Sequence, residues 1–336
     1  MNKKYVVGNI ARAVALGASL MAAAATWAQT GPTEYPRKPV TFVVGASPGG
    51  PADALTRLVT DRLKNRLGSN AVLTLDYKPG ANGQVAGAIV AKAAPDGYTL
   101  LSTAAGHTVN PALYTNMPYD PLKDLVPVAF VAYSRTVIAV ANQVPVRDLP
   151  GLIALSKSPN SDLSYASGGN GTLSHLLAEL LLGSDGAKGA RFTHVPYKSG
   201  TSALNDLMGG RVAFIFDSVQ QLAPLAQDGR LKLLAITSDR RWPSLPDVPT
   251  MKEAGFPEAT ASSWIALFAP AKTPHPILER LNIEINAILG EPEVQANLMG
   301  RGFEHVPMTL DQASQFMHTE AARWRNVVQR SGIKVD

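Results

Sequence analysis

The stretch Gly45-Ala46-Ser47-Pro48-Gly49-Gly50-Pro51-Ala52-Asp53 directly follows the apolar run Val40–Val44 and precedes a helical pattern of apolar residues. This order is typical of a turn from a buried strand into a helix, and Pro51 suits the first helical position. The paired glycines allow close approach of the backbone to a ligand. Free N–H groups at a helix start favour an anion, so the turn predicts a carboxylate cradle. Asp53 fits a cap of its own helix better than an anion contact.

A second turn of this kind lies in the other half of the chain, where Ala166-Ser167-Gly168-Gly169-Asn170-Gly171-Thr172 precedes the apolar pattern Leu173–Leu182. Its serine, asparagine and threonine add side-chain donors to the backbone N–H groups. His175, one turn into the helix, either faces the same space or packs inside. Tyr197-Lys198-Ser199-Gly200-Thr201 is a third such turn. Each turn alone is compatible with ordinary turn chemistry, but together they favour two lobes closing on one small acid.

Strands and helices alternate along the chain, and the alternation restarts in its middle, which predicts an α/β fold with parallel or mixed sheets between helices. The predicted strands cover residues 40–44, 71–75, 98–102, 137–141, 163–165, 191–195, 212–216, 232–237 and 264–268. The late helical patterns, from residue 276 onward, need a surface to cover. We therefore expect them to return to the first lobe, giving lobe 1 at 35–136 plus 264–336 and lobe 2 at 137–263.

The first 28 residues match a cleavable secretory signal peptide. Lys3, Lys4 and Arg12 form a basic start, Ala13–Ala25 is an apolar run of small residues, and Thr26-Trp27-Ala28 offers a cleavage site. A membrane anchor is the alternative, but the apolar run is shorter than a spanning helix needs. Removal of these three basic residues lowers the formal charge from +5 to +2. The remaining charge is too small to indicate a nucleic-acid partner.

Several kinds of chemistry are excluded by missing residues. The chain has no cysteine, which removes thiol nucleophiles, redox pairs and thiolate metal sites. It has no G-x-S-x-G elbow, and its six histidines show neither H-E-x-x-H nor helical i, i+4 spacing. The first glycine turn lacks the G-K-[ST] ending and the G-x-G-x-x-G pattern of nucleotide sites. We therefore expect no catalytic residue, no metal and no cofactor.

The ordered motifs resemble the tripartite tricarboxylate transporter substrate-binding proteins, also called the Bug family of periplasmic receptors. The matching segments are Tyr35–Val40, Pro48–Asp53, Lys78–Gly83, Pro95–Leu100, Asn110–Tyr114, Tyr165–His175, Val195–Lys198, Gly209–Val212, Phe216-Asp217, Pro246–Thr250, Gly255–Pro257, Trp264–Pro270 and Thr273-Pro274. Together they run along nearly the whole mature chain, so the resemblance extends to both predicted lobes.

The resemblance implies a two-lobed α/β receptor of the type II-like periplasmic binding protein kind, each lobe a mixed sheet flanked by helices, with the ligand cleft between the lobes. It implies a monomer in the periplasm that passes a small carboxylate to inner-membrane permease subunits of a tripartite tricarboxylate-type transporter. Carried over by position, the ligand-binding residues are Ser47, Pro48, Gly49, Gly50, Asp53, Ser167, Asn170, Gly171, Thr172, His175, Tyr197, Lys198, Asp217 and Ser218.

Two other roles stay open at this point. A ligand-sensing receptor would use the same site but dock on a signalling partner, and a secreted α/β hydrolase would need a base and a nucleophile in the cleft. The identity of the carboxylate also stays open. The side chains that choose it are expected in loops such as 104–110 and 258–263.

Overall fold

Two β-sheets, each flanked by helices, organise the chain in the computed structural model, which describes residues 35–68 and 70–335. The predicted signal peptide, residues 1–28, lies outside the described residues. The chain from Lys38 onward forms one compact unit. Within the described residues, no helix combines the length and the apolar character needed to cross a membrane.

The larger sheet has the strand order β11-β4-β10-β3-β1-β2. Its strands are β1 (Val40–Val44), β2 (Leu73–Tyr77), β3 (Thr99–Ala104), β4 (Leu125–Ser134), β10 (Ser263–Pro270) and β11 (Phe303–Glu304). Strand β1 pairs in parallel with β2 and β3, whereas β10 runs antiparallel to β3 and β4. The sequence VTFVV of β1 is almost entirely buried, as expected for a parallel strand covered on both faces.

Helices cover the larger sheet. They are α2 (Pro51–Leu67), α3 (Gln84–Ala91), preceded by the 3₁₀ turn η3 (Ala81–Gly83), α4 (Gly106–Leu113), α9 (His275–Leu289), α10 (Pro292–Gly300) and α11 (Leu310–Ser331). Helix α2 buries Leu55, Val59 and Leu63, which recur at helical spacing on one face, against the sheet. Helix α11 begins with a capping box between Thr309 and Gln312 and packs on β4 and α4.

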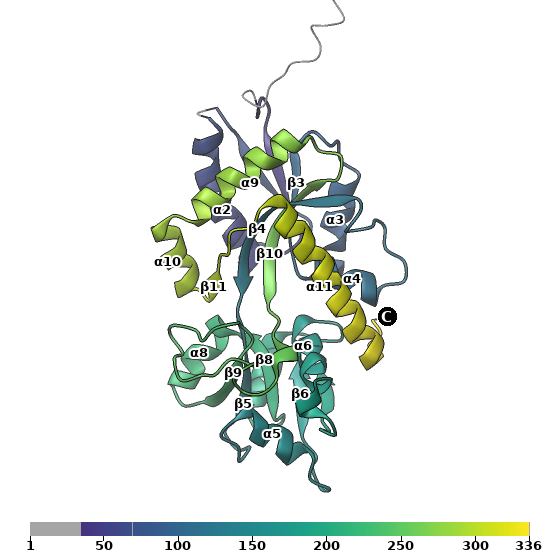
Figure 1. The fold of residues 1–336 in the computed structure, drawn as a ribbon, viewed down its shortest axis with the longest axis vertical. Coiled ribbons are helices and arrows are strands. Elements are labelled where there is room, and N and C mark those ends of the chain that lie inside the picture. Colours follow the sequence, from purple (N-terminus) through teal and green to yellow (C-terminus); the bar gives the residue numbers. More distant parts are fainter. Residues whose placement is uncertain (1–34, 69, 336) are drawn as a thin grey trace, which may run out of the picture. The chain divides into compact units, whose positions relative to one another are not determined.

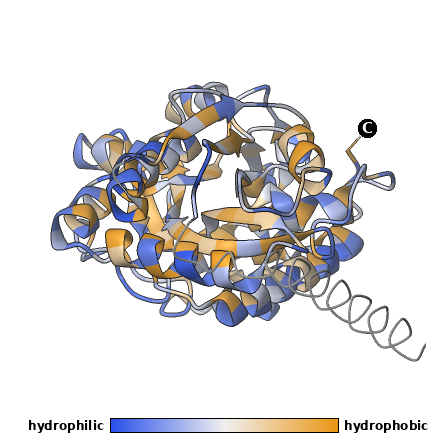
Figure 2. Cartoon of the chain, turned by 90° about the horizontal axis from the view of Figure 1, so that it is seen from above, coloured by the Kyte–Doolittle hydropathy of each residue, from blue (hydrophilic) through white to orange (hydrophobic). Residues whose placement is uncertain are grey.

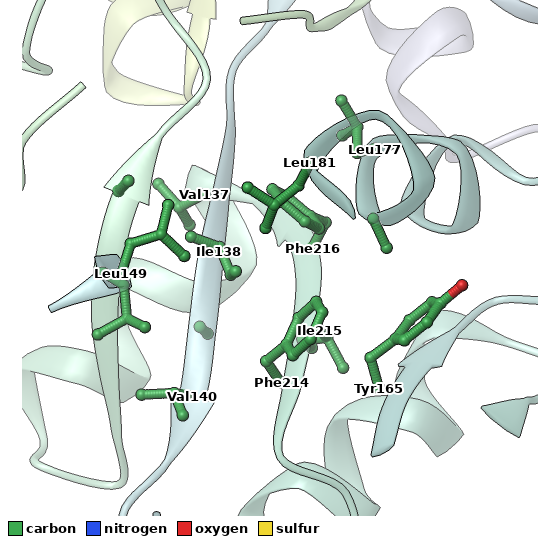
Figure 3. Close-up of a cluster of buried hydrophobic side chains, with 14 of the residues drawn as sticks. Val137, Ile138, Val140, Leu149, Tyr165, Leu177, Leu181, Phe214, Ile215 and Phe216 are labelled. Carbon is green, nitrogen blue, oxygen red and sulfur yellow. The ribbon is translucent and has the colours of Figure 1, made fainter. Parts of the chain in front are cut away.

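The smaller sheet has the strand order β7-β6-β8-β5-β9. Its strands are β5 (Thr136–Ala141), β6 (Ser164–Ser167), β7 (Thr193–Pro196), β8 (Phe214–Ser218) and β9 (Leu231–Ile236). The helices beside it are α5 (Leu149–Ser156), α6 (Leu173–Leu182), α7 (Gly200–Met208) and α8 (Val219–Gln227), with the 3₁₀ turns η4 (Asp185–Ala187) and η5 (Pro257–Ala259). Its core joins consecutive residues of β5 and β8, two strands that are buried on both faces, to Leu177 and Leu181 of α6 (Figure 3).

Two extended segments connect the sheets (Figure 1). Strand β4 ends at Ser134 in the larger sheet, and only Arg135 separates it from β5 in the smaller one. The chain returns through β10, whose first residue is Ser263. Helix α11 reaches across as well, because Trp324 belongs to the apolar cluster of the smaller sheet and Arg330 Nη1 donates to Gly183 O after α6, at 2.9 Å.

The predicted α/β class with two mixed sheets flanked by helices is confirmed. Figure 2 shows the pattern behind it: the interior strands are mostly hydrophobic, and hydrophilic residues interrupt the surrounding helices. The expected loop 104–110 is instead the end of β3 and the start of α4, a helix that holds Pro111 in its interior, where proline normally argues against helix. The lobe boundaries remain a prediction.

Candidate functional site

A cavity of about 360 Å³ lies where three helices of the smaller sheet begin. Its hydroxyl-bearing lining residues are Ser134, Thr136, Ser167, Thr172, Ser174, Ser218 and Ser263. They come from the ends of β6 and β8, from the start of α6 and from both segments that connect the sheets. We call this space the first cavity. It offers a ligand many neutral hydrogen-bond donors within a small volume.

Two uncapped helix starts contribute to the first cavity. Helices α6 and α8 have Thr172 and Ser218 as N-cap residues, and neither side chain caps its own helix. Both residues line the cavity. By contrast, α7 is capped from within, because Ser199 Oγ accepts from Ser202 N at 3.2 Å. The first-turn N–H groups of α6 and α8 have no intrahelical partner, so this end of the smaller sheet favours an anion.

Asp217 is the one titratable side chain among the described residues that line the first cavity. Its Oδ1 accepts from Ser218 N at 2.7 Å. Burial raises the pKa of this carboxyl, and the hydrogen bonds from Ser218 only partly oppose that shift. A Cβ at Gly200 would lie 3.4 Å from Asp217 Oδ2, so the start of α7 comes close to the carboxyl. The cavity thus holds one acidic group whose charge depends on pH.

The first glycine turn does not line the first cavity in this structure. Ser47, Pro48 and Gly49 are exposed at the surface of the larger-sheet lobe, next to a half-buried Gly50. Gly49 adopts a φ of +85°, and its N–H donates to Asp53 Oδ2 at 2.7 Å. The turn is therefore shaped by contacts within its own lobe.

Asp53 is buried, and internal partners surround its carboxylate. Oδ1 accepts from Arg57 Nε at 2.7 Å and from the Tyr77 hydroxyl at 2.6 Å, in addition to the bond from Gly49. Burial opposes ionisation, but these hydrogen bonds outweigh it and lower the pKa of Asp53. The residue is thus an ionised anchor for the first turn and for the start of α2.

The second turn contributes only part of its predicted residues to the first cavity. Ser167 and Thr172 line it, as do Asp217 and Ser218 after β8. Of the other predicted residues, Asn170 and Lys198 are exposed, Gly171 and His175 are buried, and Tyr197 donates its hydroxyl to Asp206 Oδ2 at 2.6 Å. None of these five lines the cavity.

Sequence reasoning missed the residues that the connecting segments supply. Ser134 and Thr136 flank the residue between β4 and β5, and Ser263 opens β10. A signal for them exists, because a short polar break between two apolar runs marks a place where a chain leaves one core and enters another. Ser174 and Gly168, which are joined by a hydrogen bond of 3.1 Å, were also missed although they belong to the second turn and the start of its helix.

Neighbouring residues on the connecting segments line a second cavity of about 350 Å³. Tyr133, Arg135 and Ser262 face it, whereas Ser134, Thr136 and Ser263 face the first cavity. Successive side chains of an extended segment point to opposite sides, which explains the alternation. The two cavities therefore lie on opposite sides of the connection between the sheets.

No group of three or more His, Asp or Glu side chains that could hold a metal ion is found in residues 35–68 and 70–335. The polar groups at the first cavity are instead hydroxyls, the N–H groups at the helix starts and the carboxyl of Asp217.

Comparison with known proteins gives a family match. Residues 55–333 match the model of the tripartite tricarboxylate transporter family receptor. The protein BugT of Bordetella pertussis is 34% identical over 329 residues, which are 97% of this chain and 99% of BugT.

Two solved structures with ligands are similar over most of the chain. A Rhodopseudomonas palustris protein determined with adipate is 32% identical, with a TM-score of 0.75 over 89% of this chain and 99% of that one. MatC from the same species, with bound malate, is also 32% identical, with a TM-score of 0.70 over 88% of this chain and 100% of MatC.

Proposed function

This chain belongs to the tripartite tricarboxylate transporter receptor family, and we propose that it captures a small carboxylate in the first cavity and delivers it to the inner-membrane subunits of a tripartite transporter. Family membership supplies the class of protein, a solute receptor. The adipate and malate of the two relatives support dicarboxylates as the first acids to test.

The observation that carries this proposal is the meeting of the α6 and α8 starts with hydroxyl groups from the connecting segments. A carboxylate placed there accepts hydrogen bonds from Ser218, Ser174 and first-turn N–H groups. No lysine or arginine lines the first cavity among the described residues. Neutral, preorganised donors therefore bind the anion, which avoids the desolvation cost of a buried cation.

We propose that lobe closure completes the site. The first turn belongs to the larger-sheet lobe, and helix α2 also begins without a side-chain cap, at Gly50. On closure, Ser47, Pro48 and the start of α2 would approach the exposed end of the ligand. A ligand that contacts both lobes stabilises the closed state by its differential affinity for it.

We propose three further properties of the protein. Residues 1–28 direct export to the periplasm, the mature protein acts as a monomer, and the lobes are 35–136 plus 264–336 and 137–263. Mass spectrometry of the exported protein and its sedimentation measure the cleavage site and the oligomeric state.

The test is a calorimetric and thermal titration of residues 29–336 with malate, adipate and citrate, and with adipamide as an uncharged control. A ligand about a hundredfold above its Kd adds roughly 2.7 kcal/mol of stability. Ser218→Ala should weaken binding, and Ser202→Ala, an exposed serine of α7, is the matched control. Stabilisation by an acid but not by adipamide supports a receptor. No stabilisation by any acid, even after unfolding and refolding, contradicts the proposal, and consumption of the acid would identify an enzyme.

A further inference from the structure

His175 contacts the second glycine turn from the interior of the protein and not from the first cavity. It lies in the first turn of α6, is only 6% exposed and does not line the first cavity. The N–H of Gly171 donates to His175 Nδ1 at 3.2 Å. Because the backbone group is the donor, Nδ1 must be unprotonated, which places the ring proton on Nε2. That nitrogen lies 3.9 Å from Glu179 Oε1, one turn further along the helix.

His194 of β7 contacts the same turn at its other end. Its Nε2 lies 2.7 Å from Ser167 Oγ. The same Oγ accepts from Gly169 N at 3.1 Å and lies 3.1 Å from Gly169 O. One imidazole thus contacts the first residue of the segment Ser167–Thr172, which we call the ligand loop, and the other contacts Gly171 near its end.

The two imidazoles form one stack. Their centroids are 3.8 Å apart at an interplanar angle of 21°, and the Tyr165 ring stacks on His194 at 4.8 Å. The Tyr165 hydroxyl donates to Glu179 Oε1 at 2.6 Å, and its ring adjoins Phe214 in the core of the smaller sheet (Figure 3). The two imidazoles that bond to the ligand loop are therefore anchored through Tyr165 to the core of the smaller sheet.

Contacts of this kind matter for the ligand loop because its glycines leave the backbone many accessible conformations. Gly169 and Gly171 have φ values of +125° and +71°, in the region that favours glycine. Burial lowers the pKa of both His175 and His194, and the neighbouring His194 lowers that of His175 further. Both rings are neutral at physiological pH, so His175 Nδ1 remains an acceptor.

We infer that His175 and His194 are positioning residues, which act through the ligand loop to hold Ser167 and Thr172 in the geometry that the first cavity presents to a ligand. This inference rests on the proposed function of the cavity. It assigns the histidines no contact with the ligand. Their role is the hydrogen bond that each makes to the loop, beyond the packing of their rings.

The experiment compares His175→Asn with His175→Leu, and uses malate as the probe. Asparagine places an oxygen acceptor where Nδ1 lies, whereas leucine fills the space without an acceptor. We expect His175→Leu to weaken binding about tenfold or more and His175→Asn to stay within about threefold of the wild type. His318→Asn, at an exposed histidine of α11, is the control for a histidine change elsewhere. For His194 the corresponding variants are His194→Gln, whose amide reaches the Nε2 position, and His194→Leu, which has no polar group there.

An NMR measurement on the ligand-free protein reads the hydrogen bond directly. A scalar coupling across the bond between the Gly171 amide nitrogen and His175 Nδ1 is expected in the wild type. Equal affinities for leucine and asparagine variants, or the lack of this coupling, would overturn the inference. If His175→Leu fails to fold, the scalar coupling in the wild type and the malate affinity of His175→Asn still test the inference. If the wild type binds no acid, the proposed function fails, while the coupling separately tests whether His175 holds the loop.

Discussion

The guanidinium of Arg135 donates from Nε to Glu304 Oε2 at 2.7 Å, which ties the residue between β4 and β5 to strand β11. Both side chains are buried, and the exposed Arg240, in the segment after β9, contacts the other carboxylate oxygen of Glu304. The backbone of Arg135 adds two bonds, from its N–H to Gly302 O at 3.1 Å and from Val219 N to its carbonyl at 2.9 Å. Arg135 is thus bonded to strand β11 of the larger sheet and to helix α8 beside the smaller one, at the point where the chain passes between the sheets.

Replacing Arg135 should therefore cost more stability than replacing Arg240. In Arg135→Met the buried Glu304 carboxylate keeps only an exposed partner, and breaking a buried pair typically costs about 3 kcal/mol or more. Arg240→Met removes an exposed partner and should cost less than about 1 kcal/mol. Urea unfolding measures both. Arg135→Met together with Glu304→Gln should recover part of the loss, and equal effects of the two arginine changes would contradict this account.

Acid should destabilise the protein through His175. Burial and the neighbouring His194 lower its folded-state pKa to about 4, below the ordinary value of about 6.5 for an unfolded chain. The unfolded state therefore binds more protons between these values, and stability is lost as the pH falls from about 6.5 towards 4. The slope reaches at most about 1.4 kcal/mol per pH unit for this one proton. The difference between wild type and His175→Asn isolates this contribution; an identical pH dependence would refute it.

Asp217 should make ligand affinity depend on pH. The pKa of its carboxyl is raised by burial, and an anionic ligand in the first cavity is repelled only by the ionised form. Affinity for a dicarboxylate should therefore fall as the pH rises through this pKa. Asp217→Asn should flatten the profile and strengthen binding about tenfold near pH 8, because one like charge is removed at close range. Calorimetry between pH 4.5 and 8 tests this; a profile unchanged in the variant would show that the ligand does not approach Asp217.

Two glycines with positive φ should respond differently to alanine. A Cβ at Gly171 would lie 2.8 Å from side-chain atoms of Leu113 and of Val335, whereas a Cβ at Gly49 meets nothing within 4 Å. Gly49→Ala should therefore cost about 1 kcal/mol of backbone strain alone. Gly171→Ala adds steric overlap and should cost about 2–4 kcal/mol. Denaturant unfolding compares the two variants. Similar losses of stability would mean that the side chains of Leu113 and Val335 move aside at no cost.

The sequence was sufficient for the fold class, and at the second turn it pointed to Ser167 and Thr172, which line the cavity, but not to Gly168, which lines it as well. It did not predict β4, whose segment contains Pro127, a residue that argues against an interior strand. The structure accommodates this proline because β11 pairs only with Tyr133 and Ser134, and because the pairing with β10 shifts register beside Pro127.

The limits of prediction at the site have a similar cause. The periodicity of apolar residues places His175 on a helix. It does not predict that the ring of His175 stacks on His194, which lies on strand β7. The relation of Ser47 to the first cavity depends on how two lobes meet, which no local pattern encodes. Ser134 and Thr136 acquire their place only once both sheets exist.

The side chains of residues 133–136 alternate between the two cavities. This alternation restricts the insertions and deletions that the chain tolerates here. Loss or gain of a single codon here would turn the following side chains to the opposite side, placing a guanidinium among the cavity hydroxyls. Point substitutions leave that frame intact, whereas an indel must come as an even number of residues to restore it. Proteins that keep this architecture should therefore differ in sequence across the connection, while its length changes only by even numbers of residues.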